Sequence, residues 1–411
     1  MKQLHRRVVV TGLGILSPIG NTVDEAWSAC SEGESGITKV DVGIIDSPVS
    51  VGGRLKNFNP LDYLDLKEVR RIDPFIQYGI IAANQSIQDS GILDFLNLDK
   101  TKVGINFGAG IGGIETIENN KLLLEYRGFK KVSPFFVPGS IVNMISGLVS
   151  IKHGFMGPNA SVVTACSSGN HCIGMSARSI AYGEANVMIG GGAEMASTPL
   201  SISGFIAARA LSTNPDPSSA SRPWDLNRDG FVLSDGAGSI VLEEYEHAKL
   251  RGAKIYAEIT GFGMSSDAYH MTAPPEDGRG AILSMKNALS DAELNIEDVD
   301  YINAHGTSTP LGDLAETRAL KNVFGASIPS ISSTKSMTGH MLGAAGAIES
   351  IFCIKAINDG IVPPTINLEA ADPQCNLNYT PNTAIEKDIS ISINNSFGFG
   401  GTNSTLVFQK I

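Results

Sequence analysis

Apolar runs alternate with amphipathic stretches along most of the chain. The runs at 7–15, 103–107 and 187–194 are typical of buried strands, because a strand covered on both faces shows no polar alternation. A glycine turn is expected to end the first of them. Residues 73–91 carry apolar side chains at helical spacing and end at a glycine, which predicts a helix. Residues 134–151 are rich in small and apolar groups and predict a buried loop and helix.

The second half of the chain repeats this plan. Strands are expected at 254–259 and 299–305, and helices at 281–293 and 313–324. A strand, turn and small-residue helix across 331–350 mirrors a similar element around residue 166, about 170 residues earlier. The alternation predicts an α/β protein of two similar halves, residues 1–250 and 251–411, with five layers in which two sheets enclose buried helices.

Composition narrows the functional class. The chain has 411 residues, of which 42 % are apolar and 18 % charged, as in ordinary globular proteins. A net charge of −11 argues against general nucleic-acid binding. No apolar run is long enough to span a membrane, and no signal peptide is visible, so we expect a cytoplasmic protein. Five cysteines without a CxxC pair suit a reducing compartment and argue against a disulfide framework or a zinc site.

Cys166 lies where a β-branched run, 161–164, meets a predicted helix. Such a turn exposes the cysteine to the helix amides and dipole, which favour a thiolate. A lone cysteine in this position is more often structural. His171, five residues further on, is expected to point away along the helix.

Three other stretches carry candidate chemistry. His305 follows a strand in a loop of hydroxyl residues, Lys335 and His340 follow another strand, and 395–403 is a glycine-dense turn. Since ligands and catalytic groups gather at the C-terminal ends of strands, these stretches and Cys166 are expected to converge.

Simpler interpretations stay open for each stretch. A histidine at a strand end is often structural, Lys335 could be a plain ion-pair partner of Glu349, and the glycine turn could be only a hairpin. His305 and His340 lack a third ligand at suitable spacing, so no metal is expected. A dinucleotide motif near the N-terminus fails because its third glycine is Ser17, and no cofactor is expected.

Four motifs in order resemble those of the β-ketoacyl-[acyl-carrier-protein] synthases, the elongating condensing enzymes of fatty-acid synthesis. They are Val163-Thr-Ala-Cys-Ser-Ser-Gly, Asn303-Ala-His-Gly-Thr-Ser-Thr-Pro, Ser333-Thr-Lys-Ser-Met-Thr-Gly-His and Asn395-Ser-Phe-Gly-Phe-Gly-Gly-Thr-Asn, supported by 221–225 and 229–233. The likeness runs from about residue 6 to residue 411 and is greatest to members that handle longer acyl chains. It implies a thiolase-like five-layered α-β-α-β-α fold and an acyltransferase activity.

The resemblance also implies a mechanism. Cys166 would take an acyl group from acyl carrier protein as a thioester, with an oxyanion hole at the amides of Cys166 and Phe399. His305 and His340 would hold the malonyl thioester, promote loss of CO2 and stabilise the enolate that attacks the acyl-cysteine.

Other residues receive roles from the same resemblance. Lys335 would support His340 through Glu349, and Phe399 would be a gate that swings aside for the acyl chain. Thr307 and Thr309 would bind the phosphopantetheine arm, and Ile111 would line the acyl pocket at the interface of a homodimer. The resemblance thus assigns substrate binding to Thr307, Thr309, Ile111 and Glu349.

Acyl carrier protein is acidic, so its docking requires a basic patch on this acidic chain. Each cluster alone could be solvated surface charge, but the resemblance assigns docking to Lys67, Arg70, Arg71, Lys130, Lys131 and Arg209.

The alternatives are related proteins. A non-catalytic chain-length factor would lack Cys166, and a starter-unit enzyme would show Cys-His-Asn instead of two histidines. A thiolase would need a second catalytic cysteine, and Cys375 lacks glycine or histidine neighbours. A type I synthase or a polyketide ketosynthase is compatible with the same motifs.

Overall fold

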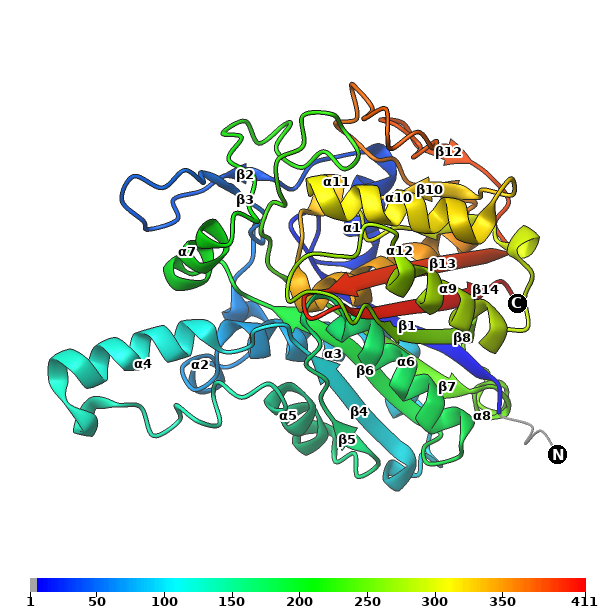
Figure 1. The fold of residues 1–411 in the computed structure, drawn as a ribbon. Coiled ribbons are helices and arrows are strands. Elements are labelled where there is room, and N and C mark those ends of the chain that lie inside the picture. The colour runs from blue at the N-terminus through cyan, green and yellow to red at the C-terminus, as the bar shows by residue number, and fades with distance from the viewer. Residues whose placement is uncertain (1–5) are drawn as a thin grey trace.

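The computed structural model describes residues 6–411 and has a 10-stranded sheet built from two equivalent parts (Figure 1). The N-terminal half-sheet has the order β5-β4-β6-β7-β1 and the C-terminal half-sheet the order β10-β9-β13-β14-β8. In each, the first three strands named are parallel and the last two pair antiparallel. Among the described residues, the half-sheets join where Val9 and Val10 of β1 pair with β8.

The strands of the N-terminal half-sheet are β1 (Val8–Leu16), β4 (Val103–Gly108), β5 (Asn159–Ala160), β6 (Val187–Glu194) and β7 (Gly236–Glu244). Those of the C-terminal half-sheet are β8 (Ala257–Ser266), β9 (Tyr301–Asn303), β10 (Ser330–Ser332), β13 (Ile391–Gly398) and β14 (Thr402–Gln409). Two small antiparallel sheets pair β2 (Thr38–Lys39) with β3 (Val51–Gly52) and β11 (Ile361–Val362) with β12 (Ile385–Glu386).

Helices form three layers around the half-sheets. α3 (Pro74–Ser90) covers the outer face of the N-terminal half-sheet, and α9 (Arg279–Asp291) covers that of the C-terminal one, with α10 (Pro310–Phe324) against it. α6 (Ser168–Ala181) and α12 (Ala345–Asp359) lie between the half-sheets and contact strands of both. The predicted five-layered α/β fold is therefore confirmed.

The remaining helices surround this core. They are α1 (Val23–Glu32), α2 (Leu66–Val69), α4 (Ile114–Arg127), α5 (Met144–His153), α7 (Pro199–Ala207), α8 (Tyr245–Leu250) and α11 (Lys335–Thr338). In the described part of the chain, no helix combines the length and the apolar character that a membrane crossing needs.

Small residues let the two middle helices approach each other. A β-carbon placed on Gly169 would lie 2.8 Å from the backbone nitrogen of Ala347, and one on Gly346 would lie 2.7 Å from Asn170 Oδ1. Neither neighbour is the free end of a long side chain, so a larger residue would push the helices apart. The N-terminal ends of α6 and α12 are therefore held close together.

The glycines of β1 have a different role from the one predicted. The expected glycine turn is wrong, because β1 continues through Gly12 and Gly14 to Leu16. A β-carbon at either glycine would lie 2.1 Å from a backbone oxygen of α3. These glycines therefore let α3 pack directly on the strand.

Two further expectations need correction. The run 161–164 forms no strand, since β5 ends at Ala160 and the N–H of Thr164 donates to Ser168 Oγ (2.9 Å) instead of to a neighbouring strand. The stretch 134–151 contains the predicted helix, but much of it is exposed, including Val137 and Ile151. The apolar composition of residues 134–151 therefore did not show whether other parts of the same chain would bury them.

Candidate active site

Cys166 lies in a tight turn at the start of α6. The preceding residue, Ala165, has a left-handed φ of +50°, which is uncommon for a residue with a side chain. Ser168 holds this turn, because its Oγ donates to the carbonyl of Ala165 (2.7 Å) and accepts from the N–H of Thr164. Cys166 is 8 % exposed, and its sulfur faces the cavity described below.

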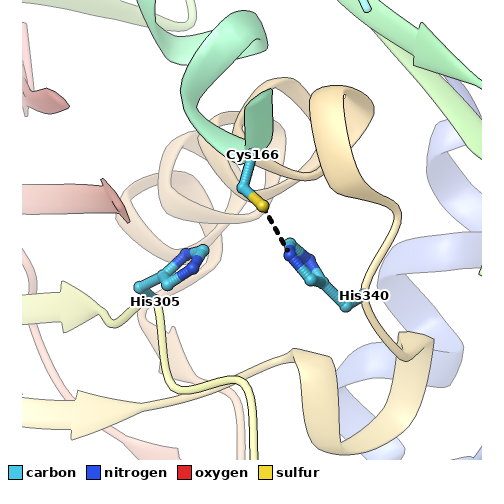
Figure 2. Close-up of side chains that lie close together, drawn as sticks. All are labelled: Cys166, His305 and His340. Carbon is cyan, nitrogen blue, oxygen red and sulfur yellow. Dashed lines mark hydrogen bonds between the residues drawn. The ribbon is translucent and has the colours of Figure 1, made fainter. Parts of the chain in front are cut away.

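The two predicted histidines meet Cys166 from the other half of the chain (Figure 2). His340 Nε2 lies 3.1 Å from Cys166 Sγ. The rings of His305 and His340 meet edge to face, with centroids 5.4 Å apart. Cys166 Sγ and one ring nitrogen from each histidine all lie within 4.8 Å of one another. The expected convergence of these three residues is therefore observed.

His340 is positioned by the segment 231–234. Its N–H donates to the carbonyl of Val232 (2.8 Å), and its carbonyl accepts from the N–H of Ser234 (3.0 Å). The ring of Phe231 packs at right angles to the imidazole, with centroids 5.2 Å apart. The segment that contains the 229–233 motif thus fixes His340 through backbone hydrogen bonds on both sides and a ring contact.

His305 is positioned by a carboxylate that the sequence interpretation missed. Glu316, on α10, accepts from the N–H groups of His305 (2.9 Å) and Gly306 (2.8 Å). A charged residue on the buried face of a predicted helix was the available signal, because a buried charge needs partners.

Glu194, at the end of β6, is a second missed carboxylate. It accepts from the N–H groups of Ile111 (3.1 Å), Gly112 (3.0 Å) and Gly343 (3.1 Å), and also from that of Gly110. It therefore joins the loop after β4 to the loop after His340.

His171 also departs from expectation. Its ring does not point away from the nucleophile turn: Nδ1 lies 2.8 Å from Thr164 Oγ1, two residues before Cys166. The ring packs edge-on against Phe262 and is almost fully buried. His171 therefore supports the turn that carries Cys166.

Burial dominates the ionisation of the cluster. It raises the pKa of Cys166 to about 12, although Lys335 and the backbone amides of Phe399 and Cys166 lower it. The amides act in the predicted direction, but desolvation, which the sequence interpretation did not weigh, outweighs them. Burial and Lys335 hold the pKa of both histidines well below the ordinary value, so both imidazoles are neutral near pH 7.

Lys335 and Glu349 form a buried ion pair between α11 and α12, and each side chain is 1 % exposed. Burial raises the pKa of Glu349 to about 7, and Lys335 opposes this shift. Glu349, expected on the substrate side, is buried outside the lining of the cavity. The plain ion pair is therefore observed, and the field of Lys335 acts on the cysteine and both histidines as well.

The cluster opens into a cavity of about 560 Å³. Its wall includes the apolar side chains of Phe205, Phe231 and Leu342. The other predicted residues on its lining are Ile111, Thr307, Thr309, Phe399 and Arg209. The hydroxyl oxygens of Thr307 and Thr309 lie 3.0 Å apart, and Phe399 is at the tip of the β13–β14 hairpin. The hairpin interpretation of the glycine turn is therefore confirmed, and Phe399 at its tip lies on the cavity wall.

The predicted basic residues are all exposed. Lys67 lies on α2, and Arg70 and Arg71 follow it directly. Lys130 and Lys131 come just after α4, and Arg209 just after α7, at the cavity wall. In Figure 1 these three helices lie on the same side of the molecule, at the left.

Comparison with known proteins identifies the family. The model of the β-ketoacyl synthase N-terminal domain matches residues 5–248, and that of the C-terminal domain matches residues 256–369. The chain belongs to the β-ketoacyl synthase family. As a member, it is a condensing enzyme of the acyltransferase type.

Individual β-ketoacyl synthases are similar over the whole chain. The 3-oxoacyl-[acyl-carrier-protein] synthase 2 of Vibrio harveyi is 53 % identical over 411 residues, which is 99 % of both proteins. A β-ketoacyl synthase structure from Burkholderia phymatum is 34 % identical with a TM-score of 0.92, covering 99 % of this chain and 100 % of that one. A type II polyketide ketosynthase, solved with its acyl carrier protein and bound to a hexaketide, has the same identity, TM-score and coverage.

Proposed function

We propose that this β-ketoacyl synthase condenses malonyl-acyl carrier protein with an acyl-acyl carrier protein primer in fatty-acid elongation, through an acyl group on Cys166. The observation that carries the proposal is the meeting of one buried thiol and two neutral imidazoles at the wall of one cavity. The 53 % identity to a 3-oxoacyl-[acyl-carrier-protein] synthase 2 favours this pathway over a polyketide one.

The first step is acyl transfer to Cys166. The primer thioester carbonyl is attacked by Sγ while His340, 3.1 Å away, takes the thiol proton. The backbone amides of Cys166 and Phe399, which already lower the pKa of the thiol, would bind the oxyanion. The carrier thiol then leaves with the proton, and His340 returns to its neutral form.

The second step uses both histidines as hydrogen-bond donors. Each neutral imidazole can donate one N–H to the thioester carbonyl oxygen of the malonyl group, where negative charge develops as CO2 leaves. The resulting carbanion attacks the acyl carbonyl on Cys166. The C–S bond then breaks, the thiolate that leaves takes a proton from solvent, and a 3-oxoacyl group remains on the carrier protein.

Phe399 and Lys335 complete the proposed machinery. Phe399 lies beside Gly400 and Gly401, whose φ values of +85° and +71° are readily accessible only to glycine. This backbone suits a ring that swings away to admit the acyl chain. Lys335 disfavours imidazolium at both histidines and so keeps them as neutral donors.

We also infer a homodimer and docking of acyl carrier protein. The segment from α4 to β5 exposes many large apolar side chains, and β5 lies at the free edge of the sheet, a combination that suits a second copy. These side chains are Ile117, Leu122, Leu124, Tyr126, Phe129, Phe135, Val137, Ile141, Ile151 and Met156. The proposed docking patch consists of six exposed basic residues: Lys67, Arg70, Arg71, Lys130, Lys131 and Arg209.

Localisation in the cytoplasm and a functional division at residue 250 are part of the same proposal. All five cysteines lie within residues 6–411 as buried free thiols, which suits a reducing compartment. The repeated strand order on either side of residue 250 supports two halves.

The decisive experiment supplies purified protein with malonyl- and acyl-acyl carrier protein. We expect release of CO2 with formation of 3-oxoacyl-acyl carrier protein. Cys166→Ala should keep decarboxylation of the malonyl substrate and lose condensation. Condensation by that variant would contradict the assignment of the nucleophile.

A further inference from the structure

The reacting cluster is also a set of metal-ligand side chains. We propose that Cys166, His305 and His340 bind a thiophilic divalent cation such as Zn²⁺, and that the bound ion blocks acylation of Cys166. The spacing of the two histidines argued against a metal because no third ligand was near them in sequence. The fold supplies that ligand from the other half of the chain.

The distances are close to those of a three-ligand site. Around a tetrahedral Zn²⁺, sulfur and nitrogen ligands lie about 2.3 and 2.0 Å from the ion, which places ligand atoms roughly 3.3–3.6 Å apart. The observed atoms lie within 4.8 Å of one another, and His340 Nε2 lies 3.1 Å from Sγ. To bind the ion, His340 must therefore move slightly away from the sulfur, and the two ligand atoms that lie farthest apart must move closer together.

The ligands match the chemistry of such an ion. Each neutral imidazole has one nitrogen lone pair, and that of His340 becomes available when the thiol exchanges its proton for the metal. The bond formed is S–Zn, the bond broken is S–H, and the proton goes to solvent. The fourth position faces the cavity, where water can complete the coordination.

The surroundings indicate reversible binding. Resident zinc sites anchor the ring nitrogen that does not bind the ion, whereas Nδ1 of His340, whose Nε2 faces Cys166, has no hydrogen-bond partner among the described residues. Lys335 repels a cation, although Glu349 pairs with it. The site therefore suits an inhibitory ion that exchanges with solvent, and not a permanent cofactor.

The test uses Co²⁺ as a spectroscopic substitute for Zn²⁺ on the full chain. Bound Co²⁺ should give a thiolate-to-metal charge-transfer band at one ion per chain, and Zn²⁺ should displace it. His305→Ala and His340→Ala each remove a ligand, and each should weaken binding by more than the roughly 10- to 100-fold that loss of a ligand's hydrogen-bond partner costs. The matched control is His270→Ala, because His270 is an exposed histidine outside the cavity lining, and this variant should bind as the parent does.

A second measurement avoids variants that fail to fold. Alkylation of Cys166 in the parent protein with iodoacetamide should abolish the band, and Zn²⁺ should slow that alkylation because a metal-bound sulfur is no longer a free nucleophile. An unmodified protein that shows no band would overturn the proposal. So would binding that survives alkylation, or an alkylation rate that Zn²⁺ leaves unchanged.

Discussion

His340 Nε2 and Cys166 Sγ lie 3.1 Å apart although 174 positions separate the two residues in the sequence. Cys166 belongs to a turn after β5, and His340 belongs to a turn after β10. Each of these strands is at an edge of its half-sheet. The contact exists only because α6 and α12 pack side by side between the half-sheets. Reactivity at the sulfur therefore depends on packing in the middle layer.

The protonation of Cys166 can be measured through its reaction with iodoacetamide. Since burial raises the pKa of the thiol to about 12, only a small fraction is thiolate at neutral pH. The alkylation rate should therefore rise about tenfold per pH unit between about pH 7 and pH 9. Mass spectrometry would confirm labelling at Cys166. A plateau within that range would show that the thiol ionises far more readily than its burial implies.

The two histidines can be tested by their separate replacement. His305→Ala and His340→Ala should each lower the rate of malonyl decarboxylation by about 10²–10³-fold, because each removes one N–H donor to the developing enolate. Release of CO2 from malonyl-acyl carrier protein is the measurement. Circular dichroism and thermal unfolding serve as controls for folding. Unaltered decarboxylation in both variants would remove the enolate role.

The ion pair of Lys335 and Glu349 should be sensitive to the loss of one partner. Lys335→Met leaves a buried carboxylate unpaired and should reduce the free energy of unfolding by about 3–5 kcal/mol. Lys335→Met combined with Glu349→Leu should recover much of that loss. Denaturant unfolding measures both.

Activity separates a supporting role of Lys335 from a structural one. If its field keeps the histidines neutral, the double variant should stay impaired in decarboxylation and show a shifted pH profile. Full decarboxylation activity in a stable double variant would show that the ion pair of Lys335 and Glu349 has only a structural role.

The close approach of α6 and α12 gives a test that touches no reacting atom. Gly169→Ala places a methyl group 2.8 Å from the backbone of α12 and should cost about 1–3 kcal/mol of unfolding free energy. Condensation should fall as Cys166 moves relative to His340. Gly204→Ala, in a helix with nothing within 4 Å of the new methyl, is the matched control. Equal behaviour of the two variants would contradict the argument.

The convergence of Cys166, His305 and His340 was predictable because each follows a strand, and strand ends of an α/β sheet meet at one edge. The supporting residues were not. Glu316 and Glu194 act by accepting from backbone N–H groups, and no side-chain pattern indicates which loop will fold past a carboxylate. His171 was misplaced because helical spacing alone gives no sign of the bend before Cys166.

Two other differences arise from competing physical effects. Glycines in β1 look the same in the sequence whether they form a turn or let a helix pack on the strand. The contact with α3 shows that the second role is the one they have. At Cys166, the helix amides lower the pKa of the thiol and desolvation raises it. Their relative sizes depend on the folded environment of the thiol.

The repeated strand order has a consequence for how this enzyme could diversify. The loop after the second strand carries Ile111 on the cavity wall in one half and His305 in the other. Under the proposed function, the N-terminal half would hold the acyl group on Cys166, and the C-terminal half would form the carbanion with His305 and His340. Substitutions in the loop that carries Ile111 could then change the acyl group that is accepted without altering the two histidines.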